Sequence, residues 1–180
     1  MRLVALAKAR PGQVTFASAG NGTSGHLALE QFRLMAGIQV IHVPYKGGGP
    51  ALSEVLAGQV QALFSIAIAA TPQVNAGKVR ALAITSARRS ALAPGLPTVA
   101  EVGFPGCEGV GWFGWLAPAR TPPEIVNRLN GELVRILSEP QTKERLLALG
   151  ADPVGNTAPA FAAFIRSEHD KWARVIRQAG

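Results

Sequence analysis

The sequence predicts an α/β protein in which a parallel sheet is covered by helices on both faces. Strand-like and helix-like segments alternate over residues 13–85, and each helix-like segment there ends at a glycine. Composition agrees, because 48% of the 180 residues are hydrophobic and only 16% are charged, which suits a folded core. No apolar run reaches the roughly eighteen residues of a membrane span, so we expect a soluble, globular chain.

The expected elements follow in a regular order. The chain opens on the last turns of an amphipathic helix, which Pro11-Gly12 closes. Apolar alternation and turn residues then predict short strands at 13–17, 39–43, 59–64 and 79–85. Helical spacing predicts helices at 23–36, 50–57 and 71–76.

The second part of the chain is predicted to be mostly helical. A loop is expected over 86–97, and the Thr98/Glu101 capping box begins a short helix. Residues 111–117 are expected to form a buried strand, with Trp115 in the core. The remaining expected elements are helices at 122–138, 141–149 and 158–178, an N-cap at Thr121, and a brief strand near 152–154.

Charge and cysteine content exclude several classes of protein. The net charge of +7 is scattered, with no basic run longer than Arg88-Arg89 and no stacking motif, so we expect no nucleic-acid partner. The single Cys107 excludes an internal disulfide and a multi-cysteine metal site. The three histidines lack metal-ligand spacing, so no metal is expected. The first residues also lack the long apolar stretch of a signal peptide.

The most informative segment leaves a strand and enters a helix through glycines and small hydroxyls. Glycines let the backbone approach a ligand, and the N–H groups of a helix's first turn favour an anion. The side chains of Ser18, Thr23 and Ser24 add neutral donors, so the segment predicts a carboxylate-binding loop. The candidate ligand-binding residues here are Ser18, Ala19, Gly20, Asn21, Gly22, Thr23 and Ser24. A glycine-rich helix cap without a ligand is the structural alternative.

The same loop satisfies the letters of the dinucleotide fingerprint G-x-G-x-x-G at Gly20–Gly25. That fingerprint requires an acidic residue about twenty positions later to hold the ribose, and none is present there. Lys46 instead suits a 2′-phosphate, so an NADP-dependent oxidoreductase fragment remains the alternative function. Otherwise no cofactor is expected.

A second strand-to-helix loop is predicted at the same sheet edge, and its candidate residues are Tyr45, Lys46, Gly47 and Gly48. Tyr45 can donate its hydroxyl to a ligand and Lys46 can supply a positive charge. The alternative is that Tyr45 packs in the core and Lys46 is solvated. Trp112 is a candidate cleft residue, with a place in the core as its alternative. No nucleophile elbow or carboxylate pair is present, so we expect no catalytic residue and no enzyme.

Six stretches together resemble the Bug-type periplasmic substrate-binding receptors of tripartite tricarboxylate transporters. They match in order and spacing, and the resemblance covers nearly the whole chain. The stretches are Ser18–Ser24, His42–Gly48, Gly77–Ala83, Leu96–Glu101, Trp112–Gly114 and Ala117-Pro118. They correspond to the later, larger part of a family member, so the chain is expected to lack the family's N-terminal part.

The resemblance implies a two-lobed, periplasmic-binding-protein-like (Venus flytrap) α/β fold whose first lobe is incomplete. By analogy, the chain divides into the end of a first-lobe helix with a crossover (1–14), the second lobe (15–86), a connecting region (87–109) and the C-terminal part of the first lobe (110–180). The lobes of such receptors close on a small carboxylated molecule. A location in the periplasm and membrane components of a transporter as partners are likewise implied.

The resemblance also bears on the ligand. A di- or tricarboxylate or an aromatic acid is expected. Family members often carry an acidic residue where Ser65 follows Phe64 here, which makes an amino-acid ligand less suitable and leaves Ser65 as a candidate site residue. Half a cleft is expected to bind weakly and to favour self-association through its exposed surface. The third hypothesis is that the chain is a stable fold without activity.

Overall fold

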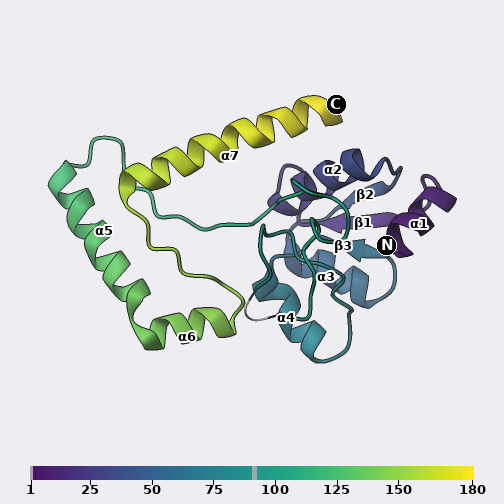
Figure 1. The fold of residues 1–180 in the computed structure, drawn as a ribbon, viewed down its shortest axis with the longest axis horizontal. Coiled ribbons are helices and arrows are strands. Elements are labelled where there is room, and N and C mark those ends of the chain that lie inside the picture. The colour runs from purple at the N-terminus through teal and green to yellow at the C-terminus, as the bar shows by residue number, and fades with distance from the viewer. Residues whose placement is uncertain (1, 91–92) are drawn as a thin grey trace. The chain divides into compact units, whose positions relative to one another are not determined.

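A computed structural model describes residues 2–90 and 93–180. Met1 of the predicted first helix, and Ala91 and Leu92 of the predicted loop, lie outside the described residues. The chain forms two compact units (Figure 1). The first runs up to Gly111 and includes Val175–Gly180, and the second is Trp112–Arg174.

The first unit is built on a parallel sheet of three short strands. They are β1 (Thr15–Ser18), β2 (Ile41–Pro44) and β3 (Ala62–Leu63), in the order β2-β1-β3. In the central strand, Phe16 is in register with His42 of β2 and Ala62 of β3. The predicted parallel sheet is therefore confirmed, with strands shorter than the sequence suggests.

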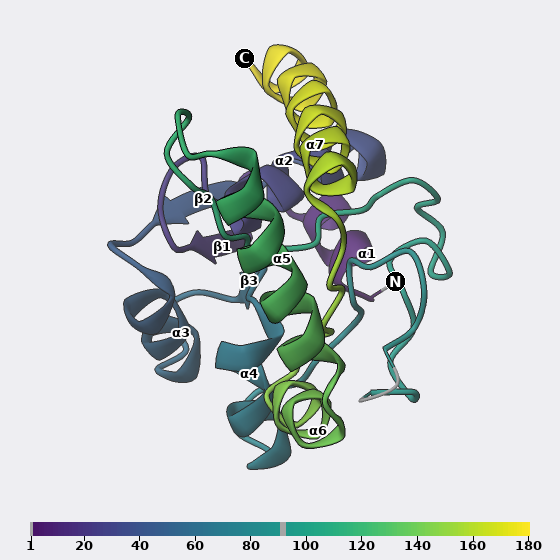
Figure 2. The same ribbon diagram turned by 90° about the vertical axis from the view of Figure 1, so that its left-hand side faces the viewer.

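Helices connect the strands and bury both faces of the sheet. They are α1 (Arg2–Ala9), α2 (Ser24–Ala36), α3 (Gly48–Leu56) and α4 (Ala67–Asn75). Neighbouring residues of a strand point to opposite faces. Accordingly, Phe16 packs with Leu29 and Phe32 of α2, whereas Ala17 packs with Ala51 of α3. The helices α2 and α3 thus lie on opposite sides of the strands (Figures 1 and 2).

Local signals set most helix ends in this unit. Gly37 ends α2 in the left-handed conformation at φ 57°, as expected. The helix α3 begins at Gly48, two residues before the predicted start, and α4 begins at Ala67 and contains Pro72. Thr98 and Glu101 form the predicted capping box through two backbone hydrogen bonds, but turns follow it instead of a helix.

Three predicted strands are wrong. Residues 79–85 form only one isolated parallel bridge, between Ile84 and Thr98. Residues 111–117 and 152–154 are in neither a helix nor a strand. Trp115 is 80% exposed, so its expected place in the core is also wrong. The reason is common to all three segments: a β-strand needs a partner strand for its hydrogen bonds, and apolar residues alone do not supply one.

The second unit consists of an extended segment and helices. The helices are α5 (Pro123–Ser138), α6 (Pro140–Ala148) and α7 (Ala158–Ala179), whose last residues belong to the first unit. Figure 2 shows α6 continuing from the end of α5. All three helices were predicted, but the N-cap of α5 is Pro122 instead of Thr121. Among the described residues, no helix is both long enough and apolar enough to cross a membrane.

Candidate functional site

The carboxyl ends of the three strands bring the predicted loops together. Because the strands are parallel and in register, the segments after Ser18, Pro44 and Leu63 leave the sheet at one edge. Two backbone bonds join the first two loops: Gly47 N–H donates to Ala19 O at 2.9 Å, and Tyr45 N–H donates to Ser18 O at 3.0 Å. The two glycine-rich loops therefore form one continuous surface, as the sequence predicts.

The first loop exposes backbone donors at the start of α2. Gly20 and Gly22 have φ of 136° and 74°, which only glycine adopts without strain. A Cβ on Gly20 would lie 3.2 Å from Tyr45 O, so this backbone also needs a residue without a side chain. Within the part of the chain that the structure describes, the N–H groups of Asn21 and of Ser24–His26 have no protein partner. These free donors and the helix dipole favour an anion.

Two of the three hydroxyls predicted to be ligand donors are engaged inside the loop. The buried Ser18 Oγ lies 2.6 Å from His42 Nε2 and accepts a hydrogen bond from Gly20 N–H at 3.1 Å. Thr23 Oγ1 donates to Gly20 O at 2.7 Å. Ser24 is exposed, and among the described residues its hydroxyl has no partner. Ser18 and Thr23 therefore shape the loop, and Ser24 is the hydroxyl that faces outward.

The second loop begins α3. Gly47 precedes the helix at φ 120°, and Gly48 is its first residue. Tyr45 packs against the core cluster that contains Ala17, and partial burial together with Glu54 raises the pKa of its hydroxyl, which keeps it a donor. Lys46 is exposed, and no described residue forms an ion pair with it. This loop combines backbone donors with one available positive charge.

The segment that follows β3 contacts the start of α2 at the same edge of the sheet. A Cβ on Gly25 would lie 2.5 Å from Phe64 O, so the start of α2 sits directly on the residue after β3. Ser65 is exposed and donates to Ile66 O at 3.2 Å. Gly111 lies against Ile66 and Ser24, since its Cβ would be within 3.4 Å of both side chains.

Trp112 belongs to the second unit, where it makes edge-to-face contacts with Phe161 and Phe164. The structure thus brings together every predicted site residue of the first unit, and Trp112 lies in the other unit.

A pair of histidines beside the first loop was not predicted. The rings of His26 and His42 stack at 4.0 Å between centroids and 18° between planes. Gly22 N–H donates to His26 Nδ1 at 3.1 Å. Burial, with a smaller effect of His26, lowers the pKa of His42, and Glu30 opposes these effects. Sequence reasoning found no metal-ligand spacing among the histidines, and it had no means of pairing residues from two different elements.

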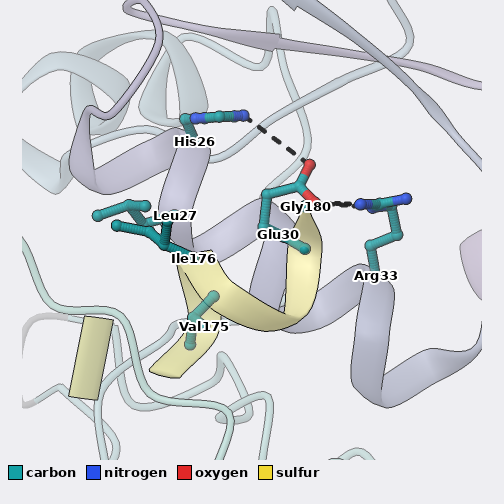
Figure 3. Close-up of a pocket in the computed structure, with 8 residues that line it drawn as sticks. His26, Leu27, Glu30, Arg33, Val175, Ile176 and Gly180 are labelled. Atoms are coloured by element: carbon teal, nitrogen blue, oxygen red, sulfur yellow. Dashed lines mark hydrogen bonds and ion pairs between the residues drawn. The ribbon is translucent and has the colours of Figure 1, made fainter. Parts of the chain in front are cut away.

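The cavity drawn in Figure 3 lies between α2 and the residues from Val175 to Gly180. It has a volume of about 250 Å³. Its polar lining comes from His26, Glu30 and Arg33 of α2, and its other side comes from the last residues of the chain, including Val175 and Gly180. Two of these side chains, Glu30 and Arg33, form an ion pair.

The whole chain matches one known protein family. A family profile described as "Tripartite tricarboxylate transporter family receptor" matches residues 1–180. The protein BugT of Bordetella pertussis is 39% identical to this chain. The alignment covers 99% of this chain and 55% of BugT. The chain thus spans about half the length of this curated relative.

Solved structures are similar over nearly the whole chain. An R. palustris protein solved with adipate is 35% identical, with a TM-score of 0.91 over 99% of this chain and 60% of its own. MatC of Rhodopseudomonas palustris, solved with bound malate, is 29% identical, with a TM-score of 0.83 over 97% of this chain and 60% of its own. These likenesses confirm the predicted α/β fold of the periplasmic binding proteins.

Proposed function

The chain belongs to the tripartite tricarboxylate transporter receptor family, and from this premise we propose that its first unit carries one side of a carboxylate-binding site. The observation that supports this proposal is the row of free backbone N–H groups at the start of α2, beside the loop that begins α3. The proposed ligand-binding residues are Ser18–Ser24, Tyr45–Gly48, Ser65 and Trp112.

The donors are suited to a carboxylate in number and strength. Each hydrogen bond to a charged oxygen contributes about 1.5–3 kcal/mol, and a helix N-terminus adds up to about 1 kcal/mol. Several such bonds supply much of the roughly 8 kcal/mol that micromolar binding requires. The donors of Asn21 and Ser24–His26, with Lys46 nearby, hold one carboxylate without a full countercharge at the loop itself.

A small aliphatic dicarboxylate is the ligand class that we favour. One structural relative was solved with adipate and another with malate, and both are dicarboxylates. The edge described above is suited to one end of such a molecule. The other end would meet a different part of the receptor, and residues 15–86 and 110–180 are proposed to belong to its two lobes.

We further propose that the receptor acts in the periplasm and presents its ligand, unchanged, to membrane components of a transporter. The membrane components would recognise the form of the receptor in which the lobes have closed over the ligand. The proposed role therefore involves binding and release, with no chemical step.

Calorimetry with adipate and malate tests the proposal, with hexane-1,6-diol as an uncharged analogue of adipate and NADPH as the competing ligand class. We expect heat from the dicarboxylates and none from the diol. Binding of NADPH without binding of either dicarboxylate would support the oxidoreductase alternative and overturn the proposal.

A pair of glycine variants tests the position of the site. Gly22→Ala and Gly12→Ala both place a side chain at positive φ with no neighbour within 4 Å, so both should cost about 1–2 kcal/mol of stability. Only Gly22 lies in the proposed binding loop. Adipate affinity should therefore fall in Gly22→Ala and stay unchanged in Gly12→Ala, and equal affinities would exclude this loop.

Thr23→Val tests the hydroxyl that shapes the loop. Loss of its bond to Gly20 O should weaken adipate binding by about 1–2 kcal/mol. The matched control is Thr71→Val, because Thr71 donates to Ala67 O inside α4 and neither residue is among the proposed ligand-binding residues. Unchanged affinity in Thr23→Val would remove Thr23 from the site.

A further inference from the structure

We propose that the stacked imidazoles of His26 and His42 are positioning residues for the Gly20–Gly22 turn, and that their protonation makes carboxylate affinity depend on pH. This inference rests on the proposed function for its effect on binding. The positioning itself is a property of the first unit alone.

Each ring holds one end of the turn. Gly22 N–H donates to His26 Nδ1 at 3.1 Å, so that nitrogen carries no proton in this arrangement. At the other end, Gly20 N–H donates to Ser18 Oγ, and that oxygen lies 2.6 Å from His42 Nε2. The stacking of the two rings at 4.0 Å therefore connects the two glycine amides through side chains from α2 and β2.

The rings are set in a defined charge environment. His26 Nε2 lies 3.8 Å from Glu30 Oε1, and Glu30 also pairs with Arg33 on the same helix. Val175, Ile176 and Gly180 line the cavity beside His26 (Figure 3). Burial and the neighbouring ring hold the pKa of His42 below its ordinary value, and Glu30 acts against them. The neutral form of the His42 ring is thus favoured.

Protonation of His26 Nδ1 would remove the hydrogen bond that holds the Gly20–Gly22 turn. A proton on His26 Nδ1 would face the Gly22 N–H, and two donors cannot bond to each other. Two charged rings at a centroid distance of 4.0 Å would also repel. The new positive charge attracts an anion, but it is partly solvated and screened, whereas release of the turn disorders the donors themselves. Carboxylate affinity should therefore be highest with both rings neutral and should fall once a ring is protonated.

Two substitutions separate positioning from titration. His26→Asn keeps an acceptor oxygen near the place of Nδ1, and His42→Gln keeps a polar group near the place of Nε2, but neither side chain titrates. His26→Leu fills space beside His42 without an acceptor. His169→Gln is the control, because His169 is 79% exposed on α7.

The first measurement is adipate affinity at about pH 8 and about pH 5.5, on either side of ordinary histidine titration. We expect a loss of about tenfold at the lower pH in the wild type and in His169→Gln, as one lost hydrogen bond would give. The His26→Asn/His42→Gln double variant should lose far less affinity at the lower pH, because only the carboxyl groups of adipate then begin to be protonated there. His26→Leu should bind about tenfold more weakly at both. A wild-type affinity that does not change with pH, or a His26→Leu variant that binds normally, would overturn the inference.

The second measurement needs no ligand. In ¹H–¹⁵N NMR spectra, the amide signals of Gly20 and Gly22 should shift together with the histidine rings as the pH is lowered. They should not shift in the double variant. Amides that ignore ring titration in the wild type would overturn the positioning role. If the amides follow the rings but no dicarboxylate binds at any pH, the positioning role holds and the proposed function fails.

Discussion

The two units of this chain are built from similar residues but differ in how much they bury. In the first unit, Phe16, Leu29 and Phe32 form a core that α1 and α2 complete on one face of the sheet. Residues 112–174, all of which the structure describes, contain no buried side chain, although α5–α7 are well-formed helices. Phe113, Trp115 and Leu116 are each at least 80% exposed.

The difference teaches that helix formation and core formation have separate causes. Capping residues, prolines at helix starts and apolar spacing are local, and they act in both units. Burial requires a second surface, which the parallel sheet supplies only in the first unit. The free energy of folding should therefore reside mainly in residues 2–111, and the following predictions test that distribution.

The largest expected effect is the loss of a core aromatic ring. Phe16→Ala should lower the free energy of unfolding by about 3–5 kcal/mol, because Phe16 is 2% exposed in the central strand. Trp115→Ala, its control in the second unit, should change it by less than about 0.5 kcal/mol. Urea titration followed by far-UV circular dichroism measures both. Similar losses in the two variants would show that the second unit is also packed.

Thiol labelling gives the next test of the same contrast. Cys107 is buried in the first core, and this burial raises the pKa of its thiol to about 11. Since only the thiolate reacts, iodoacetamide should label it about 100-fold more slowly than a thiol of ordinary pKa. In a Cys107→Ser background, Leu116→Cys should react at the ordinary rate because Leu116 is 81% exposed. Rapid labelling of native Cys107 would contradict a closed core.

The sequence was sufficient for the features that local chemistry decides. Gly37 ends α2, and the prolines near residue 123 begin α5, close to the predicted positions. The strands were predicted less well, because residues 79–85 and 111–117 have strand-like composition but lack a continuous partner. Whether such segments pair is decided by residues far away in the chain, and no local pattern contains that information.

The same distinction applies to the candidate site. The two glycine loops were predictable because backbone N–H groups at a helix start follow from the order of strand, glycines and helix. The engagement of the Ser18 hydroxyl was not, because it depends on His42, which is 24 residues away. The parallel register of Phe16 with His42 brings these side chains together. Side-chain contacts that depend on the register between strands could not be predicted from the sequence.

A pair of glycine substitutions sharpens the contrast further. A Cβ at Gly25 would lie 2.5 Å from the backbone oxygen of Phe64, which cannot move without moving the strand end. A Cβ at Gly114 would lie even closer, 2.1 Å, to the Phe161 ring, but that side chain can rotate away. Gly25→Ala should therefore cost about 1–3 kcal/mol and Gly114→Ala less than about 1 kcal/mol. Thermal unfolding of both variants measures this, and the reverse order would mean that the Phe161 ring is held firmly.

The smallest expected effect is on the stability of the chain at acidic pH. The Thr98 backbone N–H donates to Glu101, and together with Arg89 it holds the pKa of this carboxyl below its ordinary value. The folded state therefore favours the ionised form. Its contribution to stability is present above the unfolded-state pKa and is lost as the pH falls through the lower, folded-state pKa.

Glu101→Gln should accordingly flatten the fall in thermal stability of the chain below about pH 4.5 without abolishing it, because other carboxylates also titrate there. Glu132→Gln is the matched control in the second unit, where Glu132 pairs with Arg135 on the surface and such pairs contribute little. Melting temperatures measured across this acidic range decide the matter. An equal flattening in both variants would mean that the capping box stabilises the first unit no more than a surface ion pair stabilises the second.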